Sequence, residues 1–288
     1  MHPVLAQFGT LTFYTYTVLI DLGLAVALAA LYFQAPAGKA WRWLDLGLAA
    51  TVGGFVGARL LYVSMNASYY LPHIDEIVQV WQGGLAWLGA PAGALVGAWL
   101  YARRQREALW PVLDALALPF GLLSLLGWSG CLAAGCAYGF PVTPGQWPAW
   151  FISQAPDLFG LVMPRFPTQA LGIAWSILAL LAVWGARRGV ARRWPVGALG
   201  AYALSLVAVG VFGLSFTRGD PAPLMAGFRV DVVGSALVLV VTTFAWVARL
   251  VRGGPAAAGQ PPAPPTDDEP AVDPPGASAT TGDSLPNT

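Results

Sequence analysis

The sequence has few charged residues. Only 10% of its 288 residues are Asp, Glu, Lys or Arg, against about 25% in an average soluble domain. The 15 basic and 14 acidic side chains nearly balance, and no stripe of Lys and Arg runs along the chain, which argues against nucleic-acid binding. Internal repeats of the kind found in secondary transporters are also missing. What remains is 57% hydrophobic residues and 13 tryptophans, a composition that indicates a polytopic membrane protein.

Seven apolar segments are long enough to cross a bilayer, since a membrane-spanning helix needs roughly 20 residues. They are 11–33, 46–65, 84–102, 110–133, 168–186, 195–214 and 230–251. Segment 84–102 has the lowest hydropathy, because glycines and Pro91 interrupt it. The first ten residues contain no Lys or Arg, so a signal peptide is not expected. The sequence therefore predicts an all-α integral membrane protein, with seven transmembrane helices forming one domain over residues 1–252.

The positions of Lys and Arg orient these segments. If the N-terminus is outside, the inner loops and tail hold eleven basic residues and the outer segments hold three. The inner set is Lys39, Arg42, Arg103, Arg104, Arg106, Arg187, Arg188, Arg192, Arg193, Arg249 and Arg252, and the outer set is Arg165, Arg218 and Arg229. Because basic loops stay on the cytoplasmic side, the N-terminus is predicted outside and the C-terminus inside.

Two segments lie outside the predicted bundle. Residues 66–82 mix aromatic and acidic residues, and we expect them to lie on the outer membrane surface. Residues 253–288 contain nine prolines, five acids and no base. Such a composition buries too little apolar surface to fold, so this segment is predicted to be a disordered, Pro-rich, acidic cytoplasmic tail.

Three charged residues fall inside the predicted spans, where an unpaired charge is costly. Asp21 lies about ten residues from the outer face, and Arg59 lies in the outer half of its span, counting about 1.5 Å per residue. Arg59 can therefore form a structural ion pair with Asp21, or it can offer its planar guanidinium to a lipid phosphate in the outer leaflet. Asp114 falls in the first turns of its own helix, a position that favours a negative charge.

Both cysteines occur in the segment GWSGCLAAGCAYG, residues 127–139. On a regular helix, side chains five residues apart diverge by about 140°, so Cys131 and Cys136 do not meet unless Gly130 or Gly135 breaks the helix. Three alternatives stay open: two small packing residues, a disulfide on the oxidising outer side, or a reactive thiol. A metal site is not expected, because no further Cys or His supplies the remaining ligands.

Seven short segments form a series along the chain. They are MHPVLAQFGTLTFYTYTVLIDLG at 1–23, GARLLYV at 57–63, WQGGLAWLGAPAGALVG at 81–97, DALALPFG at 114–121, GWSGCLAAGCAYGFP at 127–141, RFPTQAL at 165–171 and FTRGDP at 216–221. In this order they resemble the prolipoprotein diacylglyceryl transferases of the bacterial inner membrane. The resemblance covers nearly everything up to about residue 250, and the family's topology agrees with the one predicted from charge.

The resemblance implies transfer of a diacylglyceryl group from phosphatidylglycerol to a cysteine thiol in a prolipoprotein signal peptide. Glycerol phosphate leaves and no cofactor is needed. The implied partners are phosphatidylglycerol, prolipoprotein signal peptides and membrane lipids, and the implied location is the bacterial plasma (inner) membrane. The matching positions, implied to bind substrate or lipid, are Tyr16, Arg59, Gly127, Gly130, Gly139, Arg165, Gln169 and Arg218. Arg59 and Arg218 are the candidate catalytic residues, and Arg165 would help them to bind the phosphate.

The chain also differs from the family's motifs at six positions. Leu88 stands in place of a histidine, and Trp128 and Val211 each stand in place of an arginine. Cys131 stands in place of an asparagine, and Cys136 and Ser215 each stand in place of a glutamate. A positioned base ordinarily contributes about 10²–10⁴-fold when a thiolate must form, and cationic groups stabilise a departing phosphate. Besides His2, His73 is the only histidine predicted on the outer side. A histidine in such a loop is usually exposed to solvent and has no catalytic role.

Two functions from different classes follow. The first is an enzyme: a divergent diacylglyceryl transferase, or a relative that uses another thiol or lipid acceptor. The second is a non-catalytic relative that keeps a lipid- and peptide-binding cavity. Arginines that converge on an opening toward the outer leaflet would favour the enzyme, whereas Arg59 closed against Asp21 would favour the binding protein.

Overall fold

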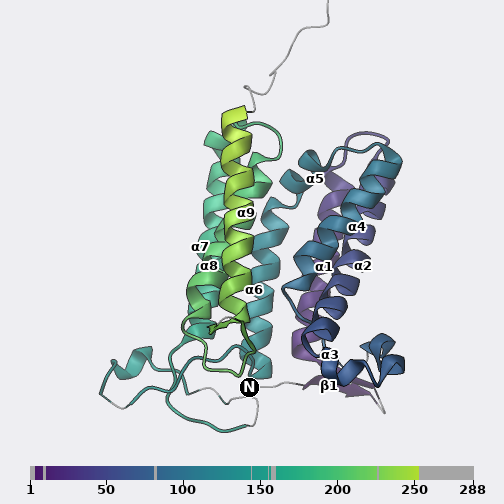
Figure 1. The fold of residues 1–288 in the computed structure, drawn as a ribbon. Coiled ribbons are helices and arrows are strands. Elements are labelled where there is room, and N and C mark those ends of the chain that lie inside the picture. Colours follow the sequence, from purple (N-terminus) through teal and green to yellow (C-terminus); the bar gives the residue numbers. More distant parts are fainter. Residues whose placement is uncertain are drawn as a thin grey trace, which may run out of the picture. The chain divides into compact units, whose positions relative to one another are not determined.

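The computed structural model describes residues 4–8, 11–80, 83–143, 145–154, 156, 160–225 and 227–252, so the predicted tail lies outside the described residues. Long helices run side by side (Figure 1). The helices are α1 (Thr15–Gln34), α2 (Ala40–Met65), α3 (Ala67–Tyr70), η1 (Ile74–Val78), α4 (Gly89–Gln105), α5 (Leu109–Ala115), α6 (Ala117–Ala134), η3 (Ala149–Phe151), α7 (Thr168–Arg188), η4 (Val190–Arg193), α8 (Ala198–Ser215) and α9 (Val230–Arg252). Two antiparallel hairpins accompany them: β1 (Val4–Phe8) with β2 (Leu11–Tyr14), and β3 (Leu224–Met225) with β4 (Phe228–Arg229).

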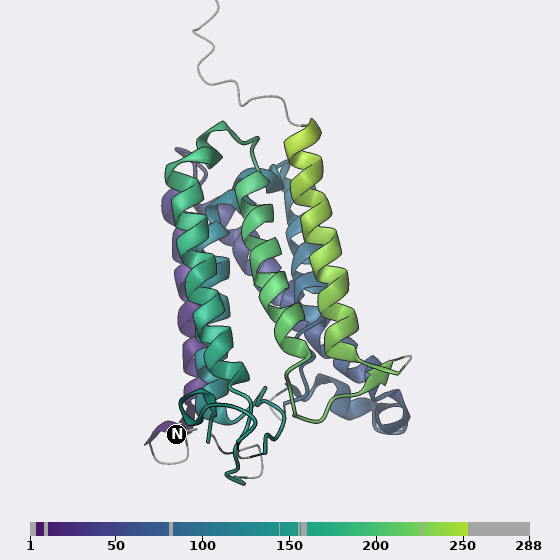
Figure 2. The same cartoon turned by 90° about the vertical axis from the view of Figure 1, so that its left-hand side faces the viewer.

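Six of the described helices are long and apolar enough to cross a membrane: α1, α2, α6, α7, α8 and α9. Figure 2 shows the last three of these, coloured from teal to yellow, side by side. The remaining predicted span, 84–102, corresponds to α4, which begins at Gly89 and has 17 residues. These helices agree with a multi-pass membrane protein.

The predicted span 110–133 is divided into two helices. α5 ends at Ala115 and α6 begins at Ala117, with Leu116 in a turn between them. Pro119 explains the division, because its ring clashes with the carbonyl group four residues earlier and it has no N–H group to donate. The prediction of one continuous helix in this segment is wrong.

Glycine residues bring α2 and α4 into backbone contact. Gly53 and Gly57 of α2 lie against Gly89, Gly93 and Gly97 of α4. A Cβ atom added at Gly93 would lie 2.1 Å from the carbonyl oxygen of Gly53, and one added at Gly89 would lie 2.2 Å from that of Gly57. Small residues four positions apart allow membrane helices to approach this closely and to gain packing contacts. The glycines that lower the hydropathy of segment 84–102 therefore serve helix packing.

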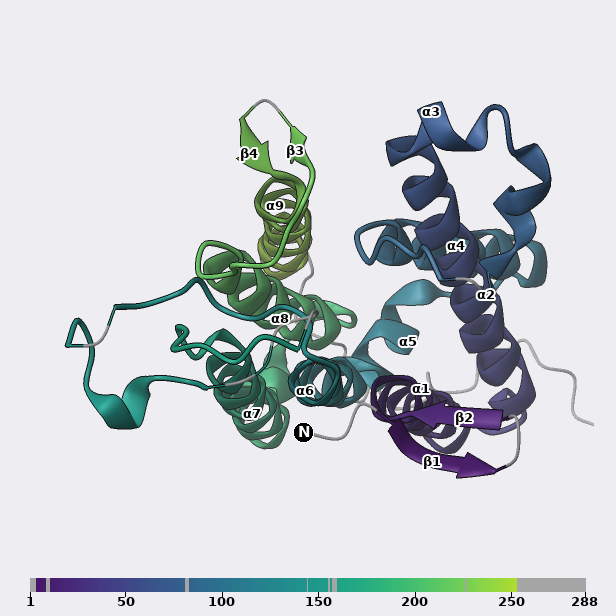
Figure 3. The same cartoon turned by 90° about the horizontal axis from the view of Figure 1, so that it is seen from below.

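Helix α6 connects two groups of helices. It contacts α1 on one side and α7 and α8 on the other, and Figure 3 shows it between α1 and α7. Tyr16 of α1 packs on Gly130, where an added Cβ would lie 2.8 Å from the ring. The indole of Trp128 lies over Gly172 of α7, where an added Cβ would lie 2.2 Å from it. Trp128 is thus a packing residue between two helices.

Asp114 caps a neighbouring helix. Its carboxylate accepts hydrogen bonds from the backbone N–H groups of Gly197, at 2.6 Å, and Gly200, at 2.9 Å. These groups lie at the start of α8, where backbone N–H groups have no partner within the helix and a negative charge is favourable. The structure therefore gives Asp114 a role at the start of α8, whereas the sequence suggested one at the start of its own helix.

We predict that Gly93→Ala destabilises the protein, because the new methyl group must fit against the backbone of α2. The free energy of unfolding should fall by about 1–3 kcal/mol, the usual cost of overpacking. Gly185→Ala in α7 is the matched control, since an added Cβ there meets nothing within 4 Å. Thermal unfolding in detergent micelles compares the two variants, and equal midpoints would contradict the close contact between α2 and α4.

Candidate functional site

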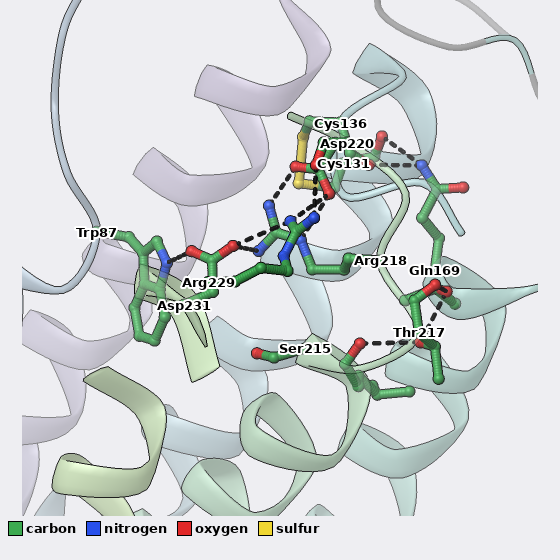
Figure 4. Close-up of polar contacts among 12 residues, drawn as sticks. Trp87, Cys131, Cys136, Gln169, Ser215, Thr217, Arg218, Asp220, Arg229 and Asp231 are labelled. Atoms are coloured by element: carbon green, nitrogen blue, oxygen red, sulfur yellow. Dashed lines mark hydrogen bonds and ion pairs between the residues drawn. A yellow bond between two sulfur atoms is a disulfide. The ribbon is translucent and has the colours of Figure 1, made fainter. Parts of the chain in front are cut away.

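Four charged side chains gather where α8 ends and α9 begins. Arg218 and Asp220 belong to the loop after α8, Arg229 ends β4, and Asp231 lies in the first turn of α9. Figure 4 shows the two guanidinium groups side by side, between the two carboxylates. We call these four residues the arginine–aspartate cluster.

Each arginine of the cluster contacts both carboxylates. Arg218 donates from Nε to Oδ1 of Asp220 at 2.8 Å and from Nη2 to Oδ2, and its Nη1 lies 3.5 Å from Oδ2 of Asp231. Arg229 donates from Nη2 to Asp220 at 3.3 Å and to Asp231 at 3.2 Å, and from Nη1 to the backbone oxygen of Asp220 at 2.7 Å. The four side chains are only 13–23% exposed, so the pairing of two positive with two negative charges stabilises them.

The cluster keeps one donor open. Arg229 Nε is buried and has no hydrogen-bond partner within the part of the chain that the structure describes. An unsatisfied buried donor is costly, so this atom marks a place where a further acceptor is favoured. Burial lowers the pKa of the Arg218 guanidinium, but the hydrogen bonds and charge of Asp220 and the charge of Asp231 outweigh burial and raise this pKa above its ordinary value. Two permanently cationic, planar groups side by side suit a phosphate.

The segment before α4 reaches the cluster. Trp87 donates from Nε1 to Oδ1 of Asp231 at 3.3 Å (Figure 4). Its neighbour Leu88 packs on α9, where a Cβ added at Gly234 would lie 2.3 Å from the Leu88 side chain. Gly234 is three residues after Asp231 and so lies on the same face of α9. Leu88 therefore adjoins the same end of α9 as Asp231.

Arg59 is buried, with 6% of its surface exposed, and holds the loop that precedes α4. Its guanidinium donates to four backbone oxygens: Nε to Ile77 at 2.8 Å, Nη1 to Gly83 at 2.7 Å and Gly84 at 2.9 Å, and Nη2 to Glu76 at 2.7 Å. Gly83 and Gly84 have φ values of 89° and 79°, which glycine adopts readily and which aim both carbonyl groups at one guanidinium. The rings of Tyr62 and Tyr70 lie 5.9 and 5.2 Å from Arg59 Cζ.

The ion pair expected between Arg59 and Asp21 is not formed. The backbone oxygens use four of the five N–H groups of Arg59. Asp21 is exposed on α1 and makes no hydrogen bond or ion pair with a described residue. Arg59 thus fixes the Gly83–Gly84 turn, and through it the segment that carries Trp87 to the cluster.

Backbone pairing places Arg218 beside Gly139. Hydrogen bonds of 2.8 and 3.0 Å join residues 138–140 to residues 217–219 in antiparallel fashion, with Gly139 opposite Arg218. On the other side of the same segment, a Cβ added at Gly139 would lie 2.0 Å from the carbonyl oxygen of Phe166. Only glycine fits between these two backbones, so Gly139 serves to position the loop that carries Arg218.

Helix α6 ends between the two cysteines. Gly135 has a left-handed conformation with φ of 74°, and the N–H of Cys136 donates to the carbonyl oxygen of Cys131 at 3.0 Å. This turn brings the side chains together, and the structure joins them in a disulfide with the Cα atoms 4.7 Å apart. Gln169 of α7 donates from Nε2 to the backbone oxygens of Cys131 at 3.2 Å and Cys136 at 2.6 Å (Figure 4). Gln169 therefore holds the turn that the disulfide closes.

Arg165 and Gly127 are the other candidate residues. Arg165 is 5% exposed, and its Cζ lies 4.4 Å from the centre of the Tyr138 ring. A Cβ added at Gly127 would approach Ile20 no closer than 3.8 Å, so packing does not require glycine there. The structure thus brings Gly139 to Arg218, Tyr16 to Gly130, and Gln169 to the cysteine turn. Arg59 holds the loop before α4, and Arg165 packs on Tyr138, the residue before Gly139.

Two further residues considered from the sequence have local partners. His73 is exposed and stacks on the Tyr69 ring with centroids 4.8 Å apart, and its Nδ1 lies 2.9 Å from the Tyr69 carbonyl oxygen. Ser215 is buried and donates to the carbonyl oxygen of Val211 at 2.7 Å. Neither residue contributes a charge to the cluster.

The sequence reasoning missed Trp87, Asp220, Arg229 and Asp231 as site residues. Arg229 was counted only for orientation. A signal was present, because the spacing Arg-x-Asp occurs twice, at 218–220 and at 229–231. The β3–β4 hairpin returns the second pair to the first, since Leu224 pairs with Arg229.

We predict that the chain, isolated and unfolded without reductant, does not react with a maleimide–polyethylene glycol reagent. After reduction, it should react with two equivalents of this reagent. Cys131 and Cys136 are its only cysteines and are joined in the structure. A gel shift reads the number of thiols directly. Two shifted steps without reductant would show free thiols and contradict the disulfide.

A sequence model of the family described as prolipoprotein diacylglyceryl transferase matches residues 3–248. The chain is similar to the phosphatidylglycerol–prolipoprotein diacylglyceryl transferase of Geobacillus kaustophilus (strain HTA426), with 29% identity over 257 residues that cover 87% of this chain and 93% of the relative. It is 32% identical to phosphatidylglycerol–prolipoprotein diacylglyceryl transferase 2 of Streptomyces coelicolor over 235 residues, 79% of this chain and 72% of the relative. A relative with the same enzyme name from Listeria monocytogenes serotype 4a is 26% identical over 264 residues, 88% and 92% of the two chains. This protein belongs to the prolipoprotein diacylglyceryl transferase family.

Proposed function

We propose that this chain is a divergent diacylglyceryl transferase acting at the outer face of a bacterial plasma membrane. It moves a diacylglyceryl group from phosphatidylglycerol to the cysteine thiol of a prolipoprotein signal peptide, and glycerol phosphate leaves. The names of its relatives supply the donor and the acceptor class. Seven spans, with the N-terminus outside and the C-terminus inside, would place the loops after α2, α6 and α8 on the outer side.

The arginine–aspartate cluster carries this proposal. Arg218 and Arg229 present two guanidinium groups side by side, and Arg229 Nε lacks an acceptor among the described residues. A phosphate between these groups would receive charge-assisted hydrogen bonds, including one from the open Nε atom. Such donors stabilise the negative charge that develops on the departing glycerol phosphate, often the largest single contribution to catalysis.

The remaining residues position these two arginines. The Gly139 pairing and the cysteine turn held by Gln169 support the loop that carries Arg218. Arg59 fixes the Gly83–Gly84 turn, so that Trp87 reaches Asp231. In this proposal Arg59 positions the site through the backbone, and Arg218 and Arg229 bind the phosphate.

A non-catalytic relative that binds lipid or peptide is the second candidate. The observation that favours it is the packing of Leu88 on α9 and of Trp128 on α7, where the family has a histidine and an arginine. Both side chains fill space between helices and offer no proton or positive charge. This alternative requires that the cluster be purely structural.

We predict that the chain restores growth to bacteria depleted of their own diacylglyceryl transferase, and adds a diacylglyceryl mass to a reporter lipoprotein. Arg229→Gln should lower transfer by about 10²-fold, the usual loss when one stabilising donor is removed. Arg193→Gln, an exposed arginine in η4 at the other end of the bundle, makes the same change and should leave transfer intact.

Membrane levels of each variant, measured in parallel, separate loss of activity from loss of protein. No mass gain with an inserted and stable wild-type chain would favour the binding relative. Full transfer by Arg229→Gln would leave the family activity in place and exclude the cluster from it.

A further inference from the structure

We infer that Asp231 is the base that takes the proton from the acceptor thiol, and that binding of the donor phosphate to the two arginines releases it for this task. The inference rests on the proposed function and goes beyond it, because it names the group that replaces the missing histidine. Three observations support it. The two arginines bind the two aspartates unequally, the charges of the cluster balance, and Asp231 lies beside Leu88.

The two aspartates of the cluster are held unequally. Asp220 is bound to Arg218 through both carboxylate oxygens, to Nε at 2.8 Å and to Nη2. Its carboxylate also lies 3.3 Å from Arg229 Nη2, and its backbone oxygen accepts from Arg229 Nη1 at 2.7 Å. The described contacts of the Asp231 carboxylate are 3.5 Å to Arg218, 3.2 Å to Arg229 and 3.3 Å to Trp87, so none of them matches the close bidentate pairing of Asp220 with Arg218. An incoming anion therefore displaces Asp231 more easily than Asp220.

The charge balance predicts an exchange of anions. The empty cluster holds two positive and two negative charges at 13–23% exposure. A phosphodiester adds one negative charge, which a partly buried, neutral cluster does not accept without a compensating change. If the phosphate replaces Asp231 on Arg218 and Arg229, the released carboxylate lies next to a new negative charge, and that charge favours its protonation. Uptake of one proton then restores the balance.

The acceptor thiol supplies that proton. The Asp231 carboxylate takes the proton of the S–H group, and the sulfur electron pair forms a bond to the glycerol carbon that carries the phosphate. The bond from this carbon to the phosphate oxygen breaks, and its electron pair leaves with the glycerol phosphate, bound to Arg218 and Arg229. Asp231 afterwards gives its proton to the leaving phosphate or to water. The thiolate is the nucleophile throughout, so no oxidant or reductant takes part.

None of the other described groups that directly face Asp231 can serve as the base. The groups that face Asp231 are Arg218 from the loop after α8, Arg229 from β4 and the Trp87 indole from the segment before α4, with Asp220 beyond the arginines. Leu88 has no titratable atom, and His73 is engaged with Tyr69 in the loop after α2. The Trp87 N–H donates to a different oxygen of Asp231 from the one held by the arginines, so it can keep the released carboxylate in place.

The pH dependence of transfer by the full-length Asp231→Asn variant tests this assignment. At about pH 7 the rate should fall by about 10²-fold or more, the usual contribution of a positioned base. At about pH 10 it should recover to within roughly tenfold of wild type, because a thiol with an ordinary pKa of about 8.5 is then already ionised. The Arg218 guanidinium stays charged at this pH, because its pKa is raised above its ordinary value. The matched control is Asp75→Asn, which removes one negative charge from an exposed aspartate in η1. This variant should have the pH dependence of transfer of the wild type.

Binding of short-chain phosphatidylglycerol, measured by calorimetry on the same proteins in detergent, adds a readout that does not need turnover. Asp231→Asn should bind this lipid at least as tightly as wild type, because the variant removes an anion that competes for the arginines. A residue with only a structural role would lose binding and activity together, at every pH.

The outcomes separate the two proposals. Rescue at high pH with retained binding supports Asp231 as the base. Wild-type activity of Asp231→Asn at about pH 7, or loss that high pH does not relieve, would overturn the assignment and leave the transferase function standing. A folded wild-type chain that transfers nothing at any pH would overturn the transferase function, and the assignment with it.

Discussion

Guanidinium groups buried at the end of this helix bundle must find partners, and the two kinds of partner they find determine the site. Arg59 is satisfied by four backbone oxygens, which hold a loop in one conformation. Arg218 and Arg229 are satisfied by two carboxylates, which, like a phosphate, offer negatively charged oxygens that can accept two hydrogen bonds from one guanidinium. The first arrangement is fixed by the covalent chain, whereas the second can exchange one anion for another. The transferase chemistry proposed here depends on that difference.

Packing explains two large apolar side chains at this end of the bundle. Trp128 and Leu88 fill contacts between helices at Gly172 and Gly234, and neither offers a charge. The charges that this end of the bundle needs then come from the loop after α8 and the start of α9. In the proposed function these charges bind the phosphate, and the packed helices position them.

Hydropathy was sufficient to predict most of the helices, because a membrane requires long apolar segments. It failed at Leu116, where Pro119, visible in the sequence, outweighs the apolar pattern. The partner of Arg59 was not predictable by depth alone, since it depends on the positive φ angles of Gly83 and Gly84 in a loop. The cluster was missed for a related reason. Its two Arg-x-Asp pairs meet only because the β3–β4 hairpin reverses the chain between them.

The most direct test of the account is an experimental structure of the full chain with phosphatidylglycerol bound. The account predicts density for the phosphate between the guanidinium groups of Arg218 and Arg229, within hydrogen-bond distance of Arg229 Nε, with the Asp231 carboxylate turned away from both. A phosphate bound elsewhere, with Asp220 and Asp231 still paired to the two arginines, would contradict it and would make the cluster a structural feature of the fold.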